Sequence, residues 1–251
     1  MGLVKLGGTE WLQPDPDLAA RAEGFADYPE GIQLTPEGEA AGRELATGLG
    51  LSGGLAEAAC AHHEDMCLLT RAEGEEQYRL VGVAVAWPSD WSPGEKMGLP
   101  LRALHAPIQG YEEQLASSVD RFMEKLKPGP IYGRANWFIA ATPDMRWDAQ
   151  PPRLAFAHVT PQNAGETLFV RSERQTLRRL PRTGAILFAI GIYVAPLAGL
   201  SPGNVRRLAD AMQSLLDGEG ERRGAGAYAP ALIGYARARQ QEAGADRKSV
   251  V

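Results

Sequence analysis

The stretch Glu173–Tyr193 reads ERQTLRRLPRTGAILFAIGIY, and its composition changes abruptly in the middle. The first part, Glu173–Leu180, carries Arg174 and Arg178 four residues apart, which is the spacing of neighbours on one helix face. We therefore predict one to two helical turns there. The second part, Ala185–Val194, is a continuous uncharged and mostly apolar run, which predicts a strand covered on both faces.

The segments around this stretch place several strands next to one another in the chain. Grouped strands, rather than strands that alternate with helices, favour an antiparallel α+β domain. The strongest helix prediction is Tyr111–Lys127, because its apolar residues fall on one face and Pro128-Gly129 ends it. The other predicted elements are a hairpin of Met66–Thr70 and Tyr78–Trp87, strands at Ile131–Thr142, Arg153–Val159 and Thr167–Arg171, and helices at Leu18–Ala26, from Thr35 and from Ser201.

The chain divides into three expected regions. Residues 1–60 form a helical and irregular segment packed on the core, and residues 61–217 form the core itself. Residues 218–251 are rich in Gly, Ala and Arg, a composition that predicts a partly flexible tail.

The composition excludes several classes of protein. With 44% hydrophobic and 23% charged residues, the chain is typical of a soluble globular protein, and its net charge of −5 gives no support for nucleic-acid binding. Two cysteines, Cys60 and Cys67, are too few for a disulfide framework and fit free thiols in a reducing cytoplasm. The uncharged stretch Thr183–Asn204 is interrupted by Pro196 and Gly199, so we do not expect a membrane span.

A histidine occupies a constrained turn in Arg102–Tyr111, which reads RALHAPIQGY. Pro107 restricts the backbone before it, and Gly110 permits a sharp turn. A neutral imidazole is the commonest protein ligand for a metal, so His105 is a candidate ligand, although a loop histidine bonded to the backbone is the common alternative. The pair His62-His63 points to opposite faces of a strand and completes no zinc site.

The arginine cluster is a candidate site for carboxylate or phosphate groups. Arg174, Arg178 and Arg179 are its centre, with further arginines close by, and a solvated basic face is the alternative. Glu173 could pair with one of these arginines and orient it. Asn136 lies inside a strand pattern, where asparagine is depleted, so it either faces solvent or makes a specific hydrogen bond.

Several segments together resemble the haem-binding alpha subunit of the haem-dependent oxidative N-demethylases. No single segment is specific, but they occur in the family's order and cover most of the chain. They are Glu10-Trp11-Leu12, Glu64-Asp65-Met66-Cys67-Leu68 with His63 in the family's Gln place, Trp87-Pro88-Ser89-Asp90-Trp91, Glu95-Lys96-Met97-Gly98, Ile108-Gln109-Gly110-Tyr111, Asn136-Trp137 and Glu173–Gly184.

The resemblance implies a PAS-like antiparallel sheet with flanking helices that holds haem b and its iron against the sheet. It also implies a monooxygenase that oxidises a methyl group of a small secondary amine and releases formaldehyde, with electrons from separate flavin and iron–sulfur reductase components. Within it, His105 is the candidate axial ligand of the haem iron, with His158 as the next candidate. Arg174, Arg178 and Arg179 are candidates for the propionates, and Glu173, Asn136 and Tyr193 are candidate catalytic residues of the distal pocket.

One departure from the family pattern bears on function. The family commonly reads IRTY where this chain has Ile190-Gly191-Ile192-Tyr193. If that arginine lines the haem pocket, the chain lacks a cation and a hydrogen-bond donor there. This favours an alternative reading as a non-catalytic haem-binding or gas-sensing PAS-like module, and a haem-free structural protein is a third reading.

Overall fold

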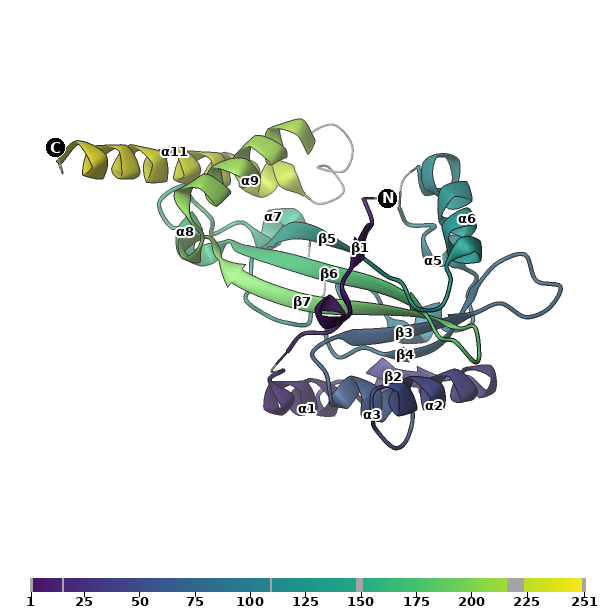
Figure 1. Ribbon diagram of the computed structural model, residues 1–251. Helices are drawn as coiled ribbons and strands as arrows, with labels where there is room; N and C mark the ends of the chain where they lie inside the picture. The colour runs from purple at the N-terminus through teal and green to yellow at the C-terminus, as the bar shows by residue number, and fades with distance from the viewer. Residues whose placement is uncertain (1, 15, 109, 148–150, 216–223, 250–251) are drawn as a thin grey trace. The chain divides into compact units, whose positions relative to one another are not determined.

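The computed structural model describes residues 2–14, 16–108, 110–147, 151–215 and 224–249 (Figure 1). Short 3-10 turns and one π-helical turn, Glu112–Ala116, connect the longer elements. The helices are α1 Leu18–Ala26, α2 Glu39–Gly48, α3 Leu55–Cys60, α4 Pro93–Lys96, α5 Leu101–Leu104, α6 Ser117–Lys125, α7 Pro152–Ala155, α8 Ala164–Thr167, α9 Pro202–Leu215 and α11 Ala225–Ser249. The strands are β1 Val4–Leu6, β2 Ile32–Leu34, β3 Asp65–Thr70, β4 Arg79–Ala84, β5 Ile131–Ala140, β6 Phe169–Arg179 and β7 Ile186–Pro196.

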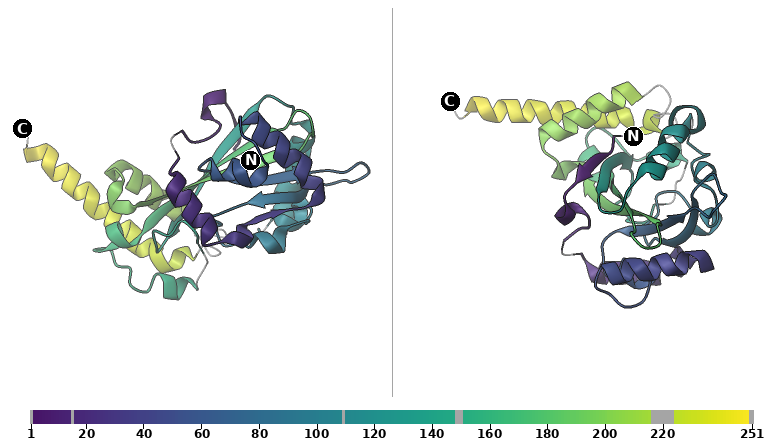
Figure 2. Two further views of the ribbon diagram at one scale, coloured as in Figure 1. Left: turned by 90° about the horizontal axis from the view of Figure 1, so that it is seen from below. Right: turned by 45° about the vertical axis from the view of Figure 1, so that its right-hand side comes forward.

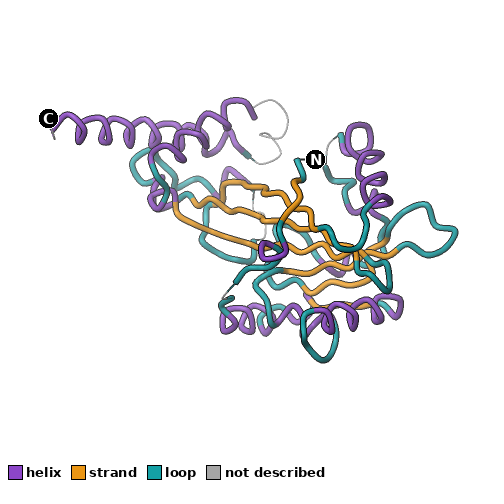
Figure 3. Tube along the Cα trace, in the orientation of Figure 1, coloured by secondary structure: helices purple, strands orange, loops and turns teal. Residues whose placement is uncertain are grey.

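The strands of the described residues form one antiparallel sheet in the order β1-β5-β6-β7-β3-β4-β2. The predicted hairpin is confirmed, since β3 pairs antiparallel with β4, with a register shift between Leu68 and Leu69. The predicted buried strand is confirmed as β7, which pairs with β3 from Asp65–Ile190 to Leu69–Ile186. The expected α+β class with an antiparallel sheet is therefore confirmed, and the long strands are continuous along their length (Figure 3).

The chain forms two compact units, one of residues 1–136 and 173–192, and one of residues 137–172 and 193–251. The sequence-based division at residues 60 and 217 stays a prediction. No helix in the described part of the chain combines the length and hydropathy that a membrane span requires.

Helices cover both faces of the sheet in the first unit. On one face, α1, α2 and α3 lie along β2, β3 and β4, while α5 and α6 lie on the other side of these strands (Figures 1 and 2). The two faces are distinguished by strand alternation. Gly82 of β4 faces Leu34, Leu55 and Leu68 on the α2/α3 face. The core on the α5/α6 face includes Cys67, Leu69, Leu101, Met123, Leu126, Leu177 and Ile186, with Tyr132, Phe122 and Phe188 packed against it.

A buried ion pair joins α1 to the sheet in the first unit. The side chain of Arg21 is fully buried, and its Nη1 lies 2.6 Å from Oδ1 of Asp65. Arg21 also donates to the carbonyl oxygens of Ala59 and Glu64, and its guanidinium lies 4.8 Å from the centroid of the Trp87 ring. Asp65 accepts two further hydrogen bonds, from the backbone N–H groups of Ala86 and Trp87. The pair therefore ties α1, α3, β3 and the end of β4 together.

The second unit has its own hydrophobic core, built around α9 and α11. Val205, Ala209 and Met212 of α9 pack with Tyr228 and Leu232 of α11. The sequence led us to expect a partly flexible tail over residues 218–251. Ala225–Ser249 form a helix, α11, and residues 216–223 and 250–251 lie outside the described part, so the partial flexibility of the tail stays a prediction. Burial of Tyr228 and Leu232 stabilises this helix, which contains three glycines and Pro230, because packing rather than propensity supplies most helical stability.

The prediction of two separate elements at Thr167–Arg171 and Glu173–Leu180 was wrong. A strand followed by a helix was expected, but a single strand, β6, runs through both segments. Residues four apart share a face in a strand as well as in a helix, so the spacing of Arg174 and Arg178 could not distinguish the two. The segment is extended because β6 lies between β5 and β7 in the sheet and pairs with both.

The strand predicted at Arg153–Val159 was also wrong. The segment begins with the short helix α7, which Pro152 opens at its first position, and continues as a turn. Phe156 is buried there against Tyr228, with ring centroids 4.7 Å apart. Apolar residues of this segment therefore pack in the core of the second unit although they do not form a strand.

The buried ion pair generates a stability prediction. Asp65→Ala leaves the Arg21 charge buried without its partner, so the free energy of unfolding should fall by about 3–5 kcal/mol. Urea denaturation measures this change. Arg43→Ala is the control, because it removes the exposed Arg43–Glu39 pair and should change the stability little. Equal effects of the two substitutions would contradict the structural role of the buried pair.

Candidate functional site

His105 lies at the C-terminal end of α5, in the turn that leads to the helix of residues 112–125. Its imidazole stacks on the ring of Tyr111, with centroids 4.4 Å apart and planes inclined by 7°. Gly110 adopts a positive φ of 72°, which explains why glycine occupies this position in the turn. Gln109, which belongs to the same motif, lies outside the described residues.

One nitrogen of the His105 ring is committed to the backbone. Nδ1 lies 2.8 Å from the carbonyl oxygen of Leu101, and a carbonyl oxygen only accepts, so Nδ1 carries the hydrogen. The neutral ring then presents its lone pair at Nε2. Burial lowers the pKa of His105, the hydrogen bond to Leu101 raises it, and the charges of Arg134 and Lys96 lower it. The net direction is downward, which favours the neutral form that a metal requires.

A polar chain runs from the neighbourhood of His105 along the α5/α6 face of the sheet. Arg134 of β5, whose charge acts on His105, donates from Nε to Oε1 of Gln175 at 2.7 Å. Gln175 donates in turn to Oε2 of Glu173 at 2.9 Å. Glu173 and Gln175 share the face of β6 that also carries Leu177, whose side chain packs in the core beside α6. Glu173 and His105 are therefore on the same face of the sheet.

Arg174 and Arg178 project from the opposite face of β6. Arg174 donates to the carbonyl oxygens of Glu10 and Trp11, and the guanidinium of Arg178 lies 4.2 Å from the centroid of the Trp11 ring. The prediction that these two arginines share a face stands, although the helix on which it was based is wrong. The structure brings them to the N-terminal segment and does not bring them to His105.

Arg179 lies on the α5/α6 face, but its donors are directed at protein oxygens. It donates to the carbonyl oxygens of Met123, Leu126 and Gly184 and to the hydroxyl of Tyr78. These contacts fasten the end of β6 to the end of α6. They favour a structural role for Arg179.

The remaining predicted site residues lie on the long strands. Asn136 is half-buried and alternates with Arg134, so both point to the same side of β5. Tyr193 is half-buried in β7 and belongs to the second unit. Gly191 and Ile192 are buried, and successive strand residues point to opposite faces. Ile192 alternates with Phe188 and so faces the α5/α6 side, whereas Gly191 alternates with Ala189 and faces the other side.

Among the other histidines, His62 makes the same kind of backbone contact as His105, to the carbonyl oxygen four residues earlier. His62 bonds through Nδ1 to the carbonyl oxygen of Ala58 at 2.8 Å, and His63 bonds through Nε2 to that of Ile192 at 2.8 Å. His158, the second candidate for an axial ligand, is exposed in the turn after α7. Within the described ranges, no group of three His, Cys, Asp or Glu side chains is arranged to hold a metal ion.

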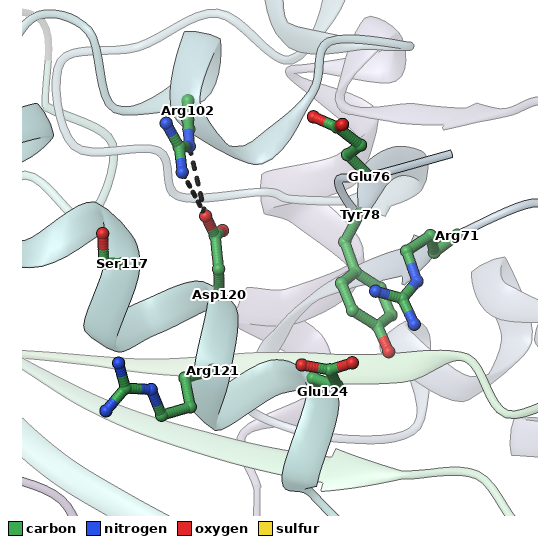
Figure 4. Close-up of a pocket in the computed structure, with 8 residues that line it drawn as sticks. All are labelled: Arg71, Glu76, Tyr78, Arg102, Ser117, Asp120, Arg121 and Glu124. Carbon is green, nitrogen blue, oxygen red and sulfur yellow. Dashed lines mark hydrogen bonds and ion pairs between the residues drawn. The ribbon is translucent and has the colours of Figure 1, made fainter. Parts of the chain in front are cut away.

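A surface pocket of about 270 Å³ lies beside α5 and α6 (Figure 4). Its lining is charged or polar, and most of its residues are exposed. They are Arg71, Glu76, Tyr78, Arg102, Ser117, Asp120, Arg121 and Glu124. Ligand pockets of cofactor size are mostly apolar and larger, so this pocket does not suit a haem.

Arg134 is the site residue that the sequence did not reveal. It lies in the middle of a strand, follows a glycine and belongs to no motif. The only available signal was the alternation of Tyr132, Arg134 and Asn136, which places a charged and a polar side chain on the same strand face as an aromatic ring.

Most of the chain matches a protein-family model. Residues 25–233 match the family described as haem-dependent oxidative N-demethylase, alpha subunit-like. The matched range includes His105, Arg134 and the whole of β6 and β7, but it excludes Trp11.

The tautomer of His105 is directly testable without any cofactor. We expect long-range ¹H–¹⁵N spectra of the imidazole to show hydrogen on Nδ1 and a lone pair on Nε2, with His105→Gln used to assign the resonances. Because burial lowers the folded-state pKa of His105, its neutral form stabilises the fold above the unfolded pKa of about 6.5. This contribution decreases as the pH falls towards the folded-state pKa. Hydrogen on Nε2 would contradict the assignment.

Proposed function

We propose a haem-dependent oxidation for this chain, which belongs to the haem-dependent oxidative N-demethylase, alpha subunit-like family. The proposed reaction oxidises one methyl group of a small secondary amine. For dimethylamine, one O₂, two electrons and two protons give methylamine, formaldehyde and water. We also propose that the antiparallel sheet with its flanking helices is a PAS-like scaffold and that the group bound is haem b.

The observation that carries the proposal is the combination, at His105, of a fixed tautomer, a ring stacked on Tyr111 and burial that lowers the pKa, whereas the backbone bond by itself is also found at His62. A histidine that ligates a metal usually donates its other ring N–H to a carbonyl or carboxylate, which sets the ring orientation and raises its basicity. His105 has this arrangement through Leu101, and its Nε2 is the free coordinating atom. Apolar side chains, including Leu104, Phe122 and Phe188, pack on the same face of the sheet. This donor set fits a haem whose iron is held by His105.

Arg134 is our preferred partner for a haem propionate. Its charge acts on His105, and among the described residues Gln175 is the one hydrogen-bond partner recorded for its guanidinium. Charge-assisted bonds from arginine are suited to carboxylates. Arg174 and Arg178 remain candidates only if the haem occupies the face that carries Trp11. Arg179 is the least suited of the three, because protein oxygens already accept from it.

The bound haem would supply the oxidising power for the reaction, and the chain's own residues would bind and orient the amine. Glu173 offers a carboxylate on the same face as His105, and Gln175 fixes it through Nε2. A secondary amine is protonated near neutral pH, and a carboxylate can pair with its ammonium group. Asn136 is the proposed polar residue near the methyl group, because it shares the side of β5 that carries Arg134, and its amide can donate or accept a hydrogen bond to orient the substrate. Tyr193 alternates with Gly191 in β7 and faces the other side of the sheet, so we do not propose it for the same pocket.

The electrons require partners. An alpha subunit-like family implies further subunits, and we propose flavin and iron–sulfur reductase components. The proposed location is the cytoplasm, because both Cys60 and Cys67 are free thiols, which are typical of a reducing compartment.

A sensing function is the second candidate. Gly191 and Ile192 occupy the positions where the family pattern has arginine and threonine. Ile192 faces the same side of the sheet as Phe188, and its buried side chain offers no polar atom. A chain that binds haem but lacks this hydrogen-bond donor fits a gas-binding module as well as an enzyme with slow turnover.

Haem affinities of two arginine variants test on which face of the sheet the haem binds. Arg134→Gln should weaken haem binding about tenfold, since a hydrogen bond to a charged group contributes roughly 1.5–3 kcal/mol. Arg178→Gln, the matched control on the opposite face, should bind haem like the wild type. Titration of haem into each protein, followed by visible absorption, measures both. The reverse result would move the proposed haem site to the face beside Trp11.

Formaldehyde release tests the reaction itself. With dimethylamine, haem and a suitable reductase, we expect slow production of formaldehyde and methylamine in equal amounts, because buried Ile192 offers no polar atom on the α5/α6 face where the family pattern has threonine. Glu173→Gln should lower this rate by about tenfold or more, because a hydrogen bond to a charged group contributes roughly 1.5–3 kcal/mol. Glu113→Gln, an exposed control, should not. If the haem is reduced and no formaldehyde appears, the enzyme proposal fails and the sensing function is favoured.

A further inference from the structure

The ring of His105 is held in two ways at once. The hydrogen bond from Nδ1 to the carbonyl oxygen of Leu101 fixes one edge of the imidazole. The stack on Tyr111, with planes 7° apart, fixes the plane of the ring. A hydrogen bond alone would still permit the imidazole to tilt about the N–H···O direction, and the Tyr111 ring blocks this tilt on one side.

Tyr111 is itself immobilised by an unusual backbone. It is 4% exposed, and its N–H donates to the carbonyl oxygen of Ile108. The π-helical turn of Glu112–Ala116 follows it directly. Single π-helical turns inside helices are rare and often occur at functional sites. Here the wide turn is placed immediately after the residue that stacks on the candidate ligand.

Arg102 connects the segment that carries His105 to the helix that follows Tyr111. Its Nε and Nη2 both donate to Oδ2 of Asp120 in α6 (Figure 4). Its Nη1 pairs with Glu112. The pairs are partly exposed, so they add little stability. They connect α5 to α6 and to the residue that follows Tyr111, so we expect them to limit changes in the spacing between the His105 and Tyr111 rings.

The hydroxyl of Tyr111 does not explain why an aromatic residue is present. The hydroxyl oxygen is buried and has no hydrogen-bond partner among the described residues. Burial raises the pKa of Tyr111 to about 12, so the hydroxyl stays protonated at neutral pH. A buried, unsatisfied hydroxyl is unfavourable for stability. Phenylalanine should therefore replace Tyr111 without loss of stability, and it is the conservative variant for a test of the ring alone.

We propose that Tyr111 is a positioning residue, which acts through its ring stack to orient the His105 imidazole towards the haem iron. This inference rests on the proposed function, in which His105 is the axial ligand. Tyr111 touches the ligand and not the reacting atoms, and the Arg102–Asp120 contact supports it from the surface.

The test compares the axial ligation of the haem-loaded full chain in several variants. Ligation is read from the visible and electron paramagnetic resonance spectra and from the midpoint potential between pH 5 and 8. Tyr111→Leu should lower the ratio of histidine-ligated to unligated iron by about two- to tenfold, which corresponds to the loss of one aromatic pair. Tyr111→Phe should restore the wild-type ratio. Phe156→Leu, which removes the aromatic pair with Tyr228 in the second unit, is the control and should leave ligation unchanged.

A second variant covers the case in which Tyr111→Leu fails to fold. Arg102→Gln changes only partly exposed ion pairs, and it should shift the ligation ratio in the same direction by a smaller factor. His105→Ala distinguishes failure of the axial assignment from failure of the positioning role of Tyr111. If it removes axial ligation while Tyr111→Leu and Arg102→Gln match the wild type, the positioning role is overturned and the axial assignment stands. If His105→Ala leaves ligation unchanged, both are overturned.

Discussion

The extended backbone of β6 is the constraint on which the arrangement of the site depends. In a strand, successive side chains point to opposite faces, so the charged residues from Glu173 to Arg179 are divided between two sides of the sheet. Glu173, Gln175 and Arg179 face α6, while Arg174 and Arg178 face the N-terminal segment at Trp11. A helix in this segment would have gathered these charges differently. One haem can contact only one of the two groups.

Because they lie on opposite faces of β6, Arg174 and Arg179 have different contacts although both belong to one arginine cluster in the sequence. Arg179 holds β6 against the end of α6, and Arg174 holds the N-terminal segment through the carbonyl oxygens of Glu10 and Trp11. Arg134, from the neighbouring strand β5, is the arginine whose charge acts on His105. We therefore propose Arg134 for the propionate-binding role that the sequence analysis gave to the cluster. The chain Arg134–Gln175–Glu173 then connects a cation near the proposed ligand to a carboxylate on the same face.

Much of the fold could be predicted from the sequence. The apolar run of β7, the hairpin of β3 and β4 and the amphipathic pattern of α6 each have a single interpretation, and each was confirmed. Prediction of secondary structure failed where contacts between residues far apart in the sequence determine it. Pairing with neighbouring strands makes β6 extended, and burial against α9 makes α11 helical despite its glycines. His105 became a candidate because a proline and a glycine lie in its turn, whereas Arg134 belongs to no local motif and became a candidate only from the pairing of the strands.

The central claim is that the iron lies on the α5/α6 face of the sheet, bound to Nε2 of His105. The most direct measurement is the position of the iron in crystals of the haem-loaded protein, from anomalous scattering at the iron absorption edge. The account predicts a single peak at bonding distance from Nε2 of His105, on the side of β5 that carries Arg134. A peak on the opposite face, beside Trp11 and Arg178, would contradict it.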